Sequence, residues 1–305
     1  MEICAFVEPQ QGASYTELRD FAVTAERLGF HGFFRSDHYL KMGEATDGAP
    51  GPTDAWTSLA AIAVETSRVR LGTLVSSVTY RTPGILAVQV ANVDEISGGR
   101  VELGLGTGWF EAEHRAYGIP FPEKRFGMLE EQLEIVRGLW SIRGDETFDF
   151  AGEHYRLEGT PARQRPVQAA VPIIVGGGGP TRTPRVAARY ASEFNSFTGP
   201  ERAGERFDVV RAACETEGRD PASLRYSAAA QVWCGRTLEE RAARAEKAGG
   251  NLENPNNAVG SPQQIVDTLA AYAERGAARV YLQFLDLREL EHLELVGTEV
   301  LPHVA

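Results

Sequence analysis

Short apolar runs rich in β-branched and aromatic residues alternate with longer amphipathic stretches along the whole chain. Runs of this length and composition are typical of buried strands. Eight strands are therefore predicted, over Ile3–Val7, Gly32–Arg35, Val69–Val75, Val101–Gly104, Pro172–Val175, Glu193–Ser196, Arg225–Cys234 and Arg279–Leu285.

The stretches between these runs have apolar residues at three- and four-residue spacing, which predicts helices. Thr53 or Asp54 can cap one of them, and Ser261-Pro262 begins another with proline in its first turn. The predicted helices are Thr16–Leu28, Asp54–Thr66, Pro83–Ile96, Arg125–Trp140, Thr183–Tyr190, Glu201–Thr216, Leu238–Ala248, Pro262–Arg275 and Leu287–Val300.

Regular alternation of strand and helix predicts an α/β protein with a parallel sheet. Eight such units with no linker rich in Pro, Gly or Ser favour a single domain over residues 1–305, closed as a (β/α)8 TIM barrel. An open, doubly wound sheet is the alternative. It is disfavoured because Glu8-Pro9-Gln10-Gln11-Gly12, and not a G-x-G-x-x-G sequence, follows the first strand.

The chain has 305 residues and a formal charge of −11, and this acidic balance argues against binding to nucleic acid or to an anionic membrane surface. No apolar run is long enough to span a membrane, and no basic leader precedes the first strand, so we expect a cytoplasmic protein. The three cysteines have no metal-binding spacing and are expected to be reduced.

In a barrel of this kind the active site is built from the loops that follow the strands. Three of the connecting segments are long, namely Asp37–Thr53, Trp109–Lys124 and Gly144–Val171. Within the last one, the alternating residues 148–150 and 154–157 on either side of Gly152 predict a small hairpin that forms a lid.

Polar residues directly follow the second and third strands. His38 is flanked by Asp37, and a histidine at a barrel mouth can act as an acid, a base or a ligand; a structural role is equally open. After the third strand, Ser76 and its neighbours have hydroxyl groups that suit a polar ring edge, although such residues are also common at strand ends.

Glycines dominate the loops after the fourth and fifth strands. Gly104, Gly106 and Gly108 alternate, which allows a flat ligand to approach the backbone closely. The four glycines Gly176, Gly177, Gly178 and Gly179 precede a helix, so their backbone N–H groups suit a phosphate. A flexible turn is the alternative.

Other chemistries are disfavoured. No H-x-H or H-E-x-x-H sequence accompanies Glu111, Glu113 and His114, so no metal site is predicted. The three lysines lie outside the predicted strands, and there is no G-x-S-x-G nucleophile elbow. A phosphate loop with few nucleophiles instead indicates an organic cofactor.

Taken together these segments resemble the luciferase-like monooxygenase superfamily, and within it the deazaflavin (coenzyme F420)-dependent oxidoreductases. The resemblance covers nearly the whole chain in order. It rests on residues 33–40 (FFRSDHYL), 52–59 (PTDAWTSL), 66–75 (TSRVRLGTLV), 97–109 (SGGRVELGLGTGW), 174–179 (IVGGGG) and 259–262 (VGSP).

The resemblance implies that a flavin-like ring lies at the C-terminal mouth. A bulge with a non-prolyl cis peptide, at Leu74, Val75 and Ser76, would support the ring. Asp37 would bind the ring edge, and His38 would face the reactive carbon. In the same way Thr107, Gly108 and the adjacent Trp109 would flank the ring, Gly176–Gly179 would hold the phosphate, and Arg182 or Arg185 would meet the anionic tail.

One departure from the resemblance concerns the base. Sugar-phosphate dehydrogenases of this group have a Glu directly after the Thr-Gly of strand four, where this chain has Trp109, so their substrate and base do not transfer. Glu8, at the end of the first strand, is the candidate substitute; a solvated carboxylate there is the alternative.

We therefore expect an enzyme that transfers a hydride between coenzyme F420 and a small organic substrate, with His38 as proton source and Asp37 favouring its imidazolium form. The alternatives are an FMN-dependent monooxygenase and a cofactor-binding protein without turnover. We also expect a homodimer. The sequence does not identify the substrate.

Overall fold

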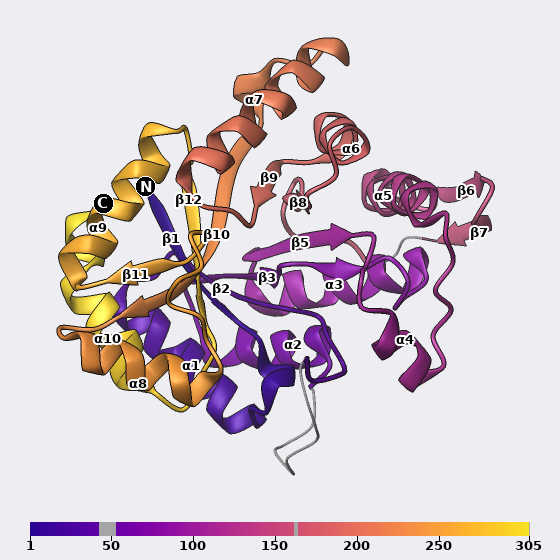
Figure 1. The fold of residues 1–305 in the computed structure, drawn as a ribbon. Coiled ribbons are helices and arrows are strands. Elements are labelled where there is room, and N and C mark those ends of the chain that lie inside the picture. The colour runs from indigo at the N-terminus through magenta and orange to yellow at the C-terminus, as the bar shows by residue number, and fades with distance from the viewer. Residues whose placement is uncertain (43–52, 162–163, 305) are drawn as a thin grey trace.

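The computed structural model describes residues 1–42, 53–161 and 164–304, and its centre is a closed barrel of eight parallel strands (Figure 1). Its strands are β1 (Glu2–Val7), β2 (Gly32–Arg35), β3 (Arg70–Thr73), β5 (Val101–Gly106), β8 (Ile173–Gly176), β9 (Glu193–Ser196), β10 (Arg225–Cys234) and β12 (Arg279–Phe284). Pairing of β9 with β10 and of β12 with β1 closes the ring. The predicted TIM barrel is confirmed.

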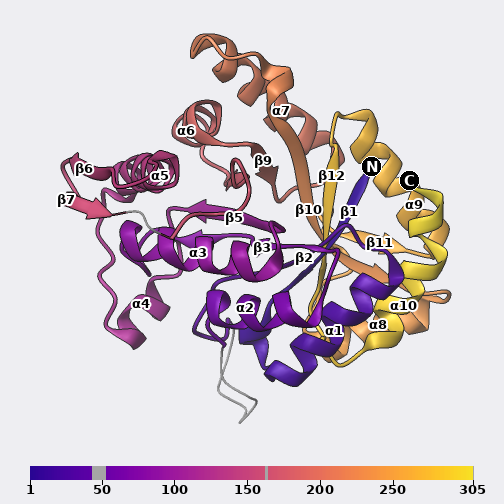
Figure 2. The ribbon, with the colours of Figure 1, turned by 180° about the vertical axis from the view of Figure 1, so that it is seen from behind.

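Helices surround this barrel on the outside, as the view from behind in Figure 2 shows. They are α1 (Tyr15–Leu28), α2 (Ala55–Glu65), α3 (Pro83–Ser97), α4 (Glu111–Tyr117), α5 (Arg125–Ser141), α6 (Arg182–Tyr190), α7 (Pro200–Thr216), α8 (Leu238–Ala248), α9 (Pro262–Glu274) and α10 (Leu290–Glu299). The predicted helices are confirmed, with ends shifted by a few residues. Helix α4 and the three-residue strand β11 (Ala258–Gly260) were not predicted.

The third strand is shorter than predicted. The expected strand Val69–Val75 ends as β3 at Thr73, and the peptide bond between Leu74 and Val75 that follows is cis. The chain then continues as β4 (Ser76–Ser77), which pairs with β5. The non-prolyl cis peptide expected near Leu74 is thus present.

The predicted hairpin is formed by β6 (Thr147–Ala151) and β7 (Arg156–Pro161), which pair antiparallel. Its position corrects the expectation of a lid. Both views show it beside α5, on the outer side of the molecule (Figures 1 and 2). The Glu131 carboxylate of α5 accepts backbone N–H bonds from residues 153–155 and so fixes the hairpin there.

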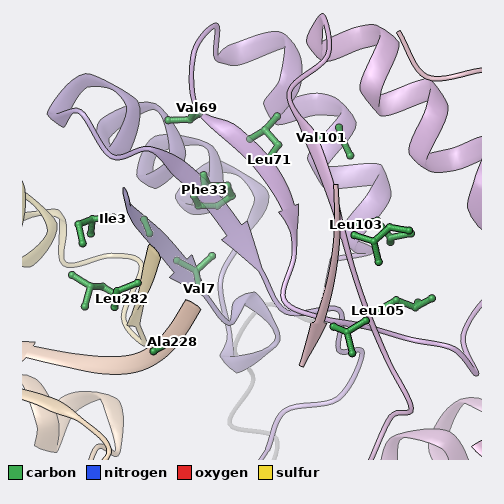
Figure 3. Packing of buried hydrophobic residues seen from close by; sticks show 14 of the residues in the cluster. Ile3, Val7, Phe33, Val69, Leu71, Val101, Leu103, Leu105, Ala228 and Leu282 are labelled. Carbon is green, nitrogen blue, oxygen red and sulfur yellow. The ribbon is translucent and has the colours of Figure 1, made fainter. Parts of the chain in front are cut away.

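Alternation along the strands divides the core into two parts. Residues such as Ile3, Phe33, Leu103 and Leu282 point outward and pack against the helices (Figure 3). A second, smaller cluster fills the barrel itself and includes Cys4, Phe34, Ile174 and Tyr281. Because the described interior is filled, a ligand of the barrel has room at its mouth and not inside it.

In the described ranges no helix is both long and apolar enough to cross a membrane. All three cysteines are buried free thiols, which rules out a disulfide framework.

Candidate active site at the mouth of the barrel

A cavity of about 510 Å³ opens at the C-terminal ends of the strands. All of the predicted site residues except Gly179 line it, namely Glu8, Asp37, His38, Leu74, Val75, Ser76, Thr107, Gly108, Trp109, Gly176, Gly177 and Gly178. Loops that are far apart in the sequence therefore meet in one place, as the barrel topology requires. Of the loop Asp37–Thr53, residues 43–52 lie outside the described residues.

His38 is oriented by a carboxylate that the sequence did not suggest. Its Nδ1 lies 3.1 Å from Oε1 of Glu113, which is fully buried on α4. The other oxygen of Glu113 accepts the backbone N–H groups of Tyr39 and Leu40. When Nδ1 donates to Glu113, Nε2 is left as the ring nitrogen available to a ligand.

Asp37 does not take this role, because its hydrogen bonds are made with residues other than His38. Its side chain, 1% exposed, accepts from Ser76 Oγ at 2.6 Å and forms an ion pair with Arg81. Neighbouring residues in an extended segment point to opposite sides, and the two side chains accordingly find different partners.

Arg81 connects Asp37 to a second carboxylate, Asp54, at the N-terminus of α2. Burial opposes ionisation of Asp54, but hydrogen bonds from Tyr39 and from the Thr57 backbone, together with the charge of Arg81, lower its pKa to about 2. Asp54 is therefore ionised at neutral pH. The contacts with Arg81 and Ser76 hold Asp37 rigidly at the edge of the cavity.

Glu8 enters the cavity from the end of β1. Burial raises the pKa of its carboxyl above the ordinary range, although the charge of His38 and a hydrogen bond from Gln283 act in the opposite direction. The carboxyl group thus keeps its proton to a higher pH than a solvated carboxylate would. The alternative of a solvated strand-end carboxylate does not fit this environment.

The bulge between β3 and β4 packs tightly against β5. A Cβ at Gly106 would come within 2.9 Å of the Val75 side chain, and a Cβ at Gly104 within 2.1 Å of the Thr73 carbonyl oxygen. Glycine is therefore needed on β5 for the bulge to form. Trp109 is 63% exposed at the rim, stacked on Phe110 and edge-on to His38.

The glycine run follows β8, which lies three strands around the barrel from β2, the strand that precedes His38. A side chain at Gly178 would meet no atom within 4 Å, so this part of the loop is open. Arg206 of α7 donates to the carbonyl oxygen of Gly179 at 2.6 Å, and Arg202 also lines the cavity. Arg182 and Arg185, the cations expected here, instead face Glu130.

Comparison with known proteins places this chain in a family. The sequence profile described as luciferase-like monooxygenase matches residues 1–258. The chain belongs to the luciferase-like monooxygenase family. As a member it is a flavin- or deazaflavin-dependent oxidoreductase.

Two relatives illustrate the range of similarity. An uncharacterised protein of Mycobacterium tuberculosis is 30% identical over 269 residues, which cover 84% of this chain and 91% of the relative. The F420-dependent glucose-6-phosphate dehydrogenase of Nakamurella multipartita is 37% identical over 188 residues, which cover 60% of this chain and 52% of that enzyme.

Solved structures share the fold. An F420-dependent secondary alcohol dehydrogenase, in complex with an F420-acetone adduct, superposes with a TM-score of 0.85 at 19% identity and covers 100% of this chain and 99% of its own. A monooxygenase of Streptomyces bottropensis superposes with a TM-score of 0.80 at 23% identity over 100% of both chains.

In this luciferase-like protein, Glu113 and His114 after β5 bind other residues of the cavity wall. Glu113 binds the segment around His38, and His114 binds Thr79 at 2.6 Å. Within the described ranges, no three His, Cys, Asp or Glu side chains are grouped to hold a metal ion.

Sequence reasoning missed Glu113, Arg81, Arg202 and Arg206 as site residues. Glu113 was considered only as part of a metal cluster. A signal for it was present, because a carboxylate in the loop after strand four must lie near the loop after strand two in a closed barrel.

Proposed function

We propose that this protein is a coenzyme F420-dependent oxidoreductase that transfers a hydride between the deazaflavin and a small organic substrate. The observation that carries the proposal is the mouth cavity, which combines an apolar bulge, an open glycine run flanked by two arginines, and a histidine oriented by a buried carboxylate. The F420-dependent relatives and the F420-dependent enzymes of the same fold support the choice of cofactor.

The residues at the mouth fit such a cofactor. The bulge at Leu74–Val75 offers an apolar surface against which a flat ring can lie, with Thr107 and Gly108 beside it. Gly176–Gly178 leave the backbone accessible to a phosphate, and Arg202 and Arg206 add positive charge for an anionic tail despite the acidic chain.

When bound, a deazaflavin supplies a carbon centre that accepts or donates a hydride with little reactivity toward oxygen. The contribution of this chain is orientation and proton transfer. When His38 is protonated on both ring nitrogens, Nε2 can deliver its proton to the substrate and leave a neutral ring, and the buried Glu113 carboxylate stabilises the imidazolium before the transfer. Glu8, whose pKa is raised by burial, is a second candidate proton source in the same cavity.

A second cavity of about 730 Å³ adjoins the first, over the ends of β1, β10 and β12. Glu8, Met42 and Phe197 line both cavities and form their boundary. We assign this space to the substrate, because a ligand there would contact Glu8 while a ring occupies the first cavity. Gln283 also lines it, and its Oε1 is buried without a partner among the described residues.

An FMN-dependent monooxygenase is the second candidate, because the phosphate and ring features suit FMN as well and the monooxygenase of Streptomyces bottropensis has the same fold. Titration of the purified protein with F420 and with FMN, followed by absorbance and fluorescence, distinguishes the two. We expect tighter binding of F420. Tighter binding of FMN, with oxygen consumption on adding a reductant, would reverse the assignment, and binding without turnover of any substrate would favour a carrier.

The partners are proposals too. We propose a homodimer and no nucleic-acid or membrane partner. Exposed apolar side chains at Val64 on α2 and at Ile85, Val88 and Ile96 on α3 offer a surface that a second copy would cover. Light scattering of the eluting protein tests this. A monomer at micromolar concentration would overturn it.

A further inference from the structure

Ser77 is a polar residue of the mouth cavity that the proposed function does not use. It lies in β4 directly after the bulge, opposite Gly106 of β5, and is 7% exposed. Its hydroxyl lies so close to Gly108 that a Cβ there would be 2.2 Å from Ser77 Oγ. The hydroxyl therefore has a fixed place on the cavity wall.

The hydrogen-bond network behind Ser77 begins at His114, whose side chain is buried in α4. Its Nδ1 lies 2.8 Å from the carbonyl oxygen of Phe110. A carbonyl oxygen can only accept, so Nδ1 carries a proton. The other contacts described for the ring are with Thr79, Tyr80 and Phe121, without a carboxylate, and an unpaired buried cation would be costly. The ring is therefore neutral, and Nε2 is an acceptor.

Because His114 Nε2 is an acceptor, the direction of the two hydrogen bonds that lead from His114 to Ser77 is determined. Thr79 Oγ1 lies 2.6 Å from His114 Nε2 and must donate its proton to it. Ser77 Oγ lies 2.6 Å from Thr79 Oγ1, whose proton is already used, so Ser77 must donate to Thr79. The Ser77 hydroxyl has no further proton. One of its lone pairs accepts the Thr79 backbone N–H at 3.4 Å, so the hydroxyl presents its other lone pair, and no proton, to the cavity.

We propose that Ser77 is a specificity-determining acceptor that recognises an uncharged N–H donor of the bound cofactor, and that Thr79 and His114 are positioning residues that fix its polarity. The imide N–H of a flavin-type pyrimidinedione ring has the required chemistry. A carbonyl or carboxylate oxygen placed at the same point would meet lone pairs and be disfavoured. The proposal rests on the proposed function only in requiring that a flavin-type ring occupies the cavity.

The proposal is tested with two matched ligand pairs: a 5-deazaflavin mononucleotide and FMN, each compared with its derivative methylated at the imide nitrogen. Dissociation constants come from fluorescence titration and do not depend on turnover. Wild-type protein should prefer the N–H form by about 5- to 10-fold, the value of one net hydrogen bond. Ser77→Ala should abolish this preference.

Two further variants test whether the direction of the Ser77 hydroxyl proton matters, and not only the presence of the hydroxyl. Thr79→Val keeps the shape but removes the acceptor, so Ser77 can turn its proton to the cavity and the preference should fall to about twofold or less. Thr79→Ser should restore it. Thermal midpoints of all variants, measured without ligand, exclude loss of folding as the cause.

A preference that persists in Ser77→Ala would mean that the methyl group is excluded by shape alone, and it would overturn the proposal. So would a full preference in Thr79→Val, or none in the wild type. Failure of the proposed cofactor is seen separately, because FMN would then bind more tightly than the deazaflavin while the effect of methylation can still be read from the FMN pair.

Discussion

The two ends of the barrel interior both hold charged and polar side chains, but the two ends differ in how completely these side chains are paired within the protein. At the N-terminal end, Arg279 is 1% exposed and is bound to Glu2, Glu102 and Glu193 at 2.7, 2.6 and 2.9 Å. Tyr281 adds a hydrogen bond to Glu193 at 2.7 Å. Each charge in this cluster has its counter-charge within the protein.

At the C-terminal mouth the polar groups are oriented, but some of their hydrogen-bonding positions have no partner among the described residues. His38 is fixed through one nitrogen only, Gly178 faces open space, and Gln283 Oε1 lacks a partner among the described residues. Buried polar groups are normally paired, and an unpaired one needs an explanation. The contrast indicates that the Arg279 cluster at the N-terminal end stabilises the fold, whereas the polar groups at the mouth require a ligand as their partner.

The pKa directions follow the local balance of burial and neighbouring charge at both ends. Burial would raise the pKa of Glu102, but Arg279 and Arg70 lower it, so this carboxylate stays ionised. For Glu193 burial prevails and the pKa is raised. Glu8 at the mouth is also raised by burial, without an arginine to compensate.

The strongest test of the comparison is the removal of His38. His38→Ala should lose turnover by about 10²- to 10⁴-fold, because a placed general acid contributes that much, and should bind the cofactor with near-normal affinity. Stopped-flow measurement of the change in deazaflavin absorbance gives the rate. His303→Ala, at an exposed site, is the control. An unchanged rate would remove His38 from the mechanism and leave Glu8 or water as the proton source.

At the N-terminal end of the barrel we expect a substitution to lower stability and to leave cofactor binding unchanged. Arg279→Met removes the buried partner that Glu102 and Glu193 share and leaves each with one partly exposed arginine, Arg70 or Arg225. It should destabilise the fold by about 3–5 kcal/mol, while cofactor affinity of the folded protein is unchanged. Urea unfolding gives the stability. Arg185→Met, which breaks a half-exposed pair with Glu130, should cost about 0.5 kcal/mol or less. Weakened cofactor binding in Arg279→Met would erase the distinction between the two ends.

The glycine run separates ligand binding from folding. Gly178→Val should weaken F420 binding by more than about tenfold and leave the thermal midpoint of the ligand-free protein unchanged, because the added side chain meets open space. Gly177 has a φ of +138°, so Gly177→Val should lower both affinity and stability. Calorimetry of both variants checks this. Unchanged affinity in Gly178→Val would mean that the run is only a turn.

The smallest effect concerns pH. The raised pKa of Glu8 means that its carboxyl is neutral at mildly acidic pH and becomes a carboxylate as the pH rises through that value. The new negative charge should weaken binding of the anionic cofactor by roughly threefold. Dissociation constants measured from pH 4 to 8 should show this loss in the wild type and not in Glu8→Gln. The same pH dependence in both proteins would exclude Glu8 as its source.

The fold was predictable because its signals are local. Apolar strands and amphipathic helices alternate, and each of the eight predicted strands is present in the barrel. The break after Thr73 was not visible in the pattern itself, because Leu74 and Val75 continue the apolar run; only the resemblance to a family indicated it. Helix α4 was missed because its seven residues are mostly polar and it has no capping side chain.

The site was predictable to the extent that its residues follow strands. Asp37, His38 and the glycine run could be located in this way. Their partners could not, because the pairing of His38 with Glu113 joins residues 75 positions apart. Likewise Arg202 and Arg206 lie within an ordinary amphipathic helix, and only the packing of α7 beside α6 and β9 brings them to the glycine run.

Helix α4 has a consequence for attempts to redesign this protein. Two successive residues of one short helix, Glu113 and His114, support different walls of the same cavity. A library that randomised this segment would disturb both walls at once, and improved variants would be rare. Met42, Phe197 and Gln231 line the second cavity from three separate strand ends. Directed evolution toward new substrates should therefore begin with those positions and keep α4 constant.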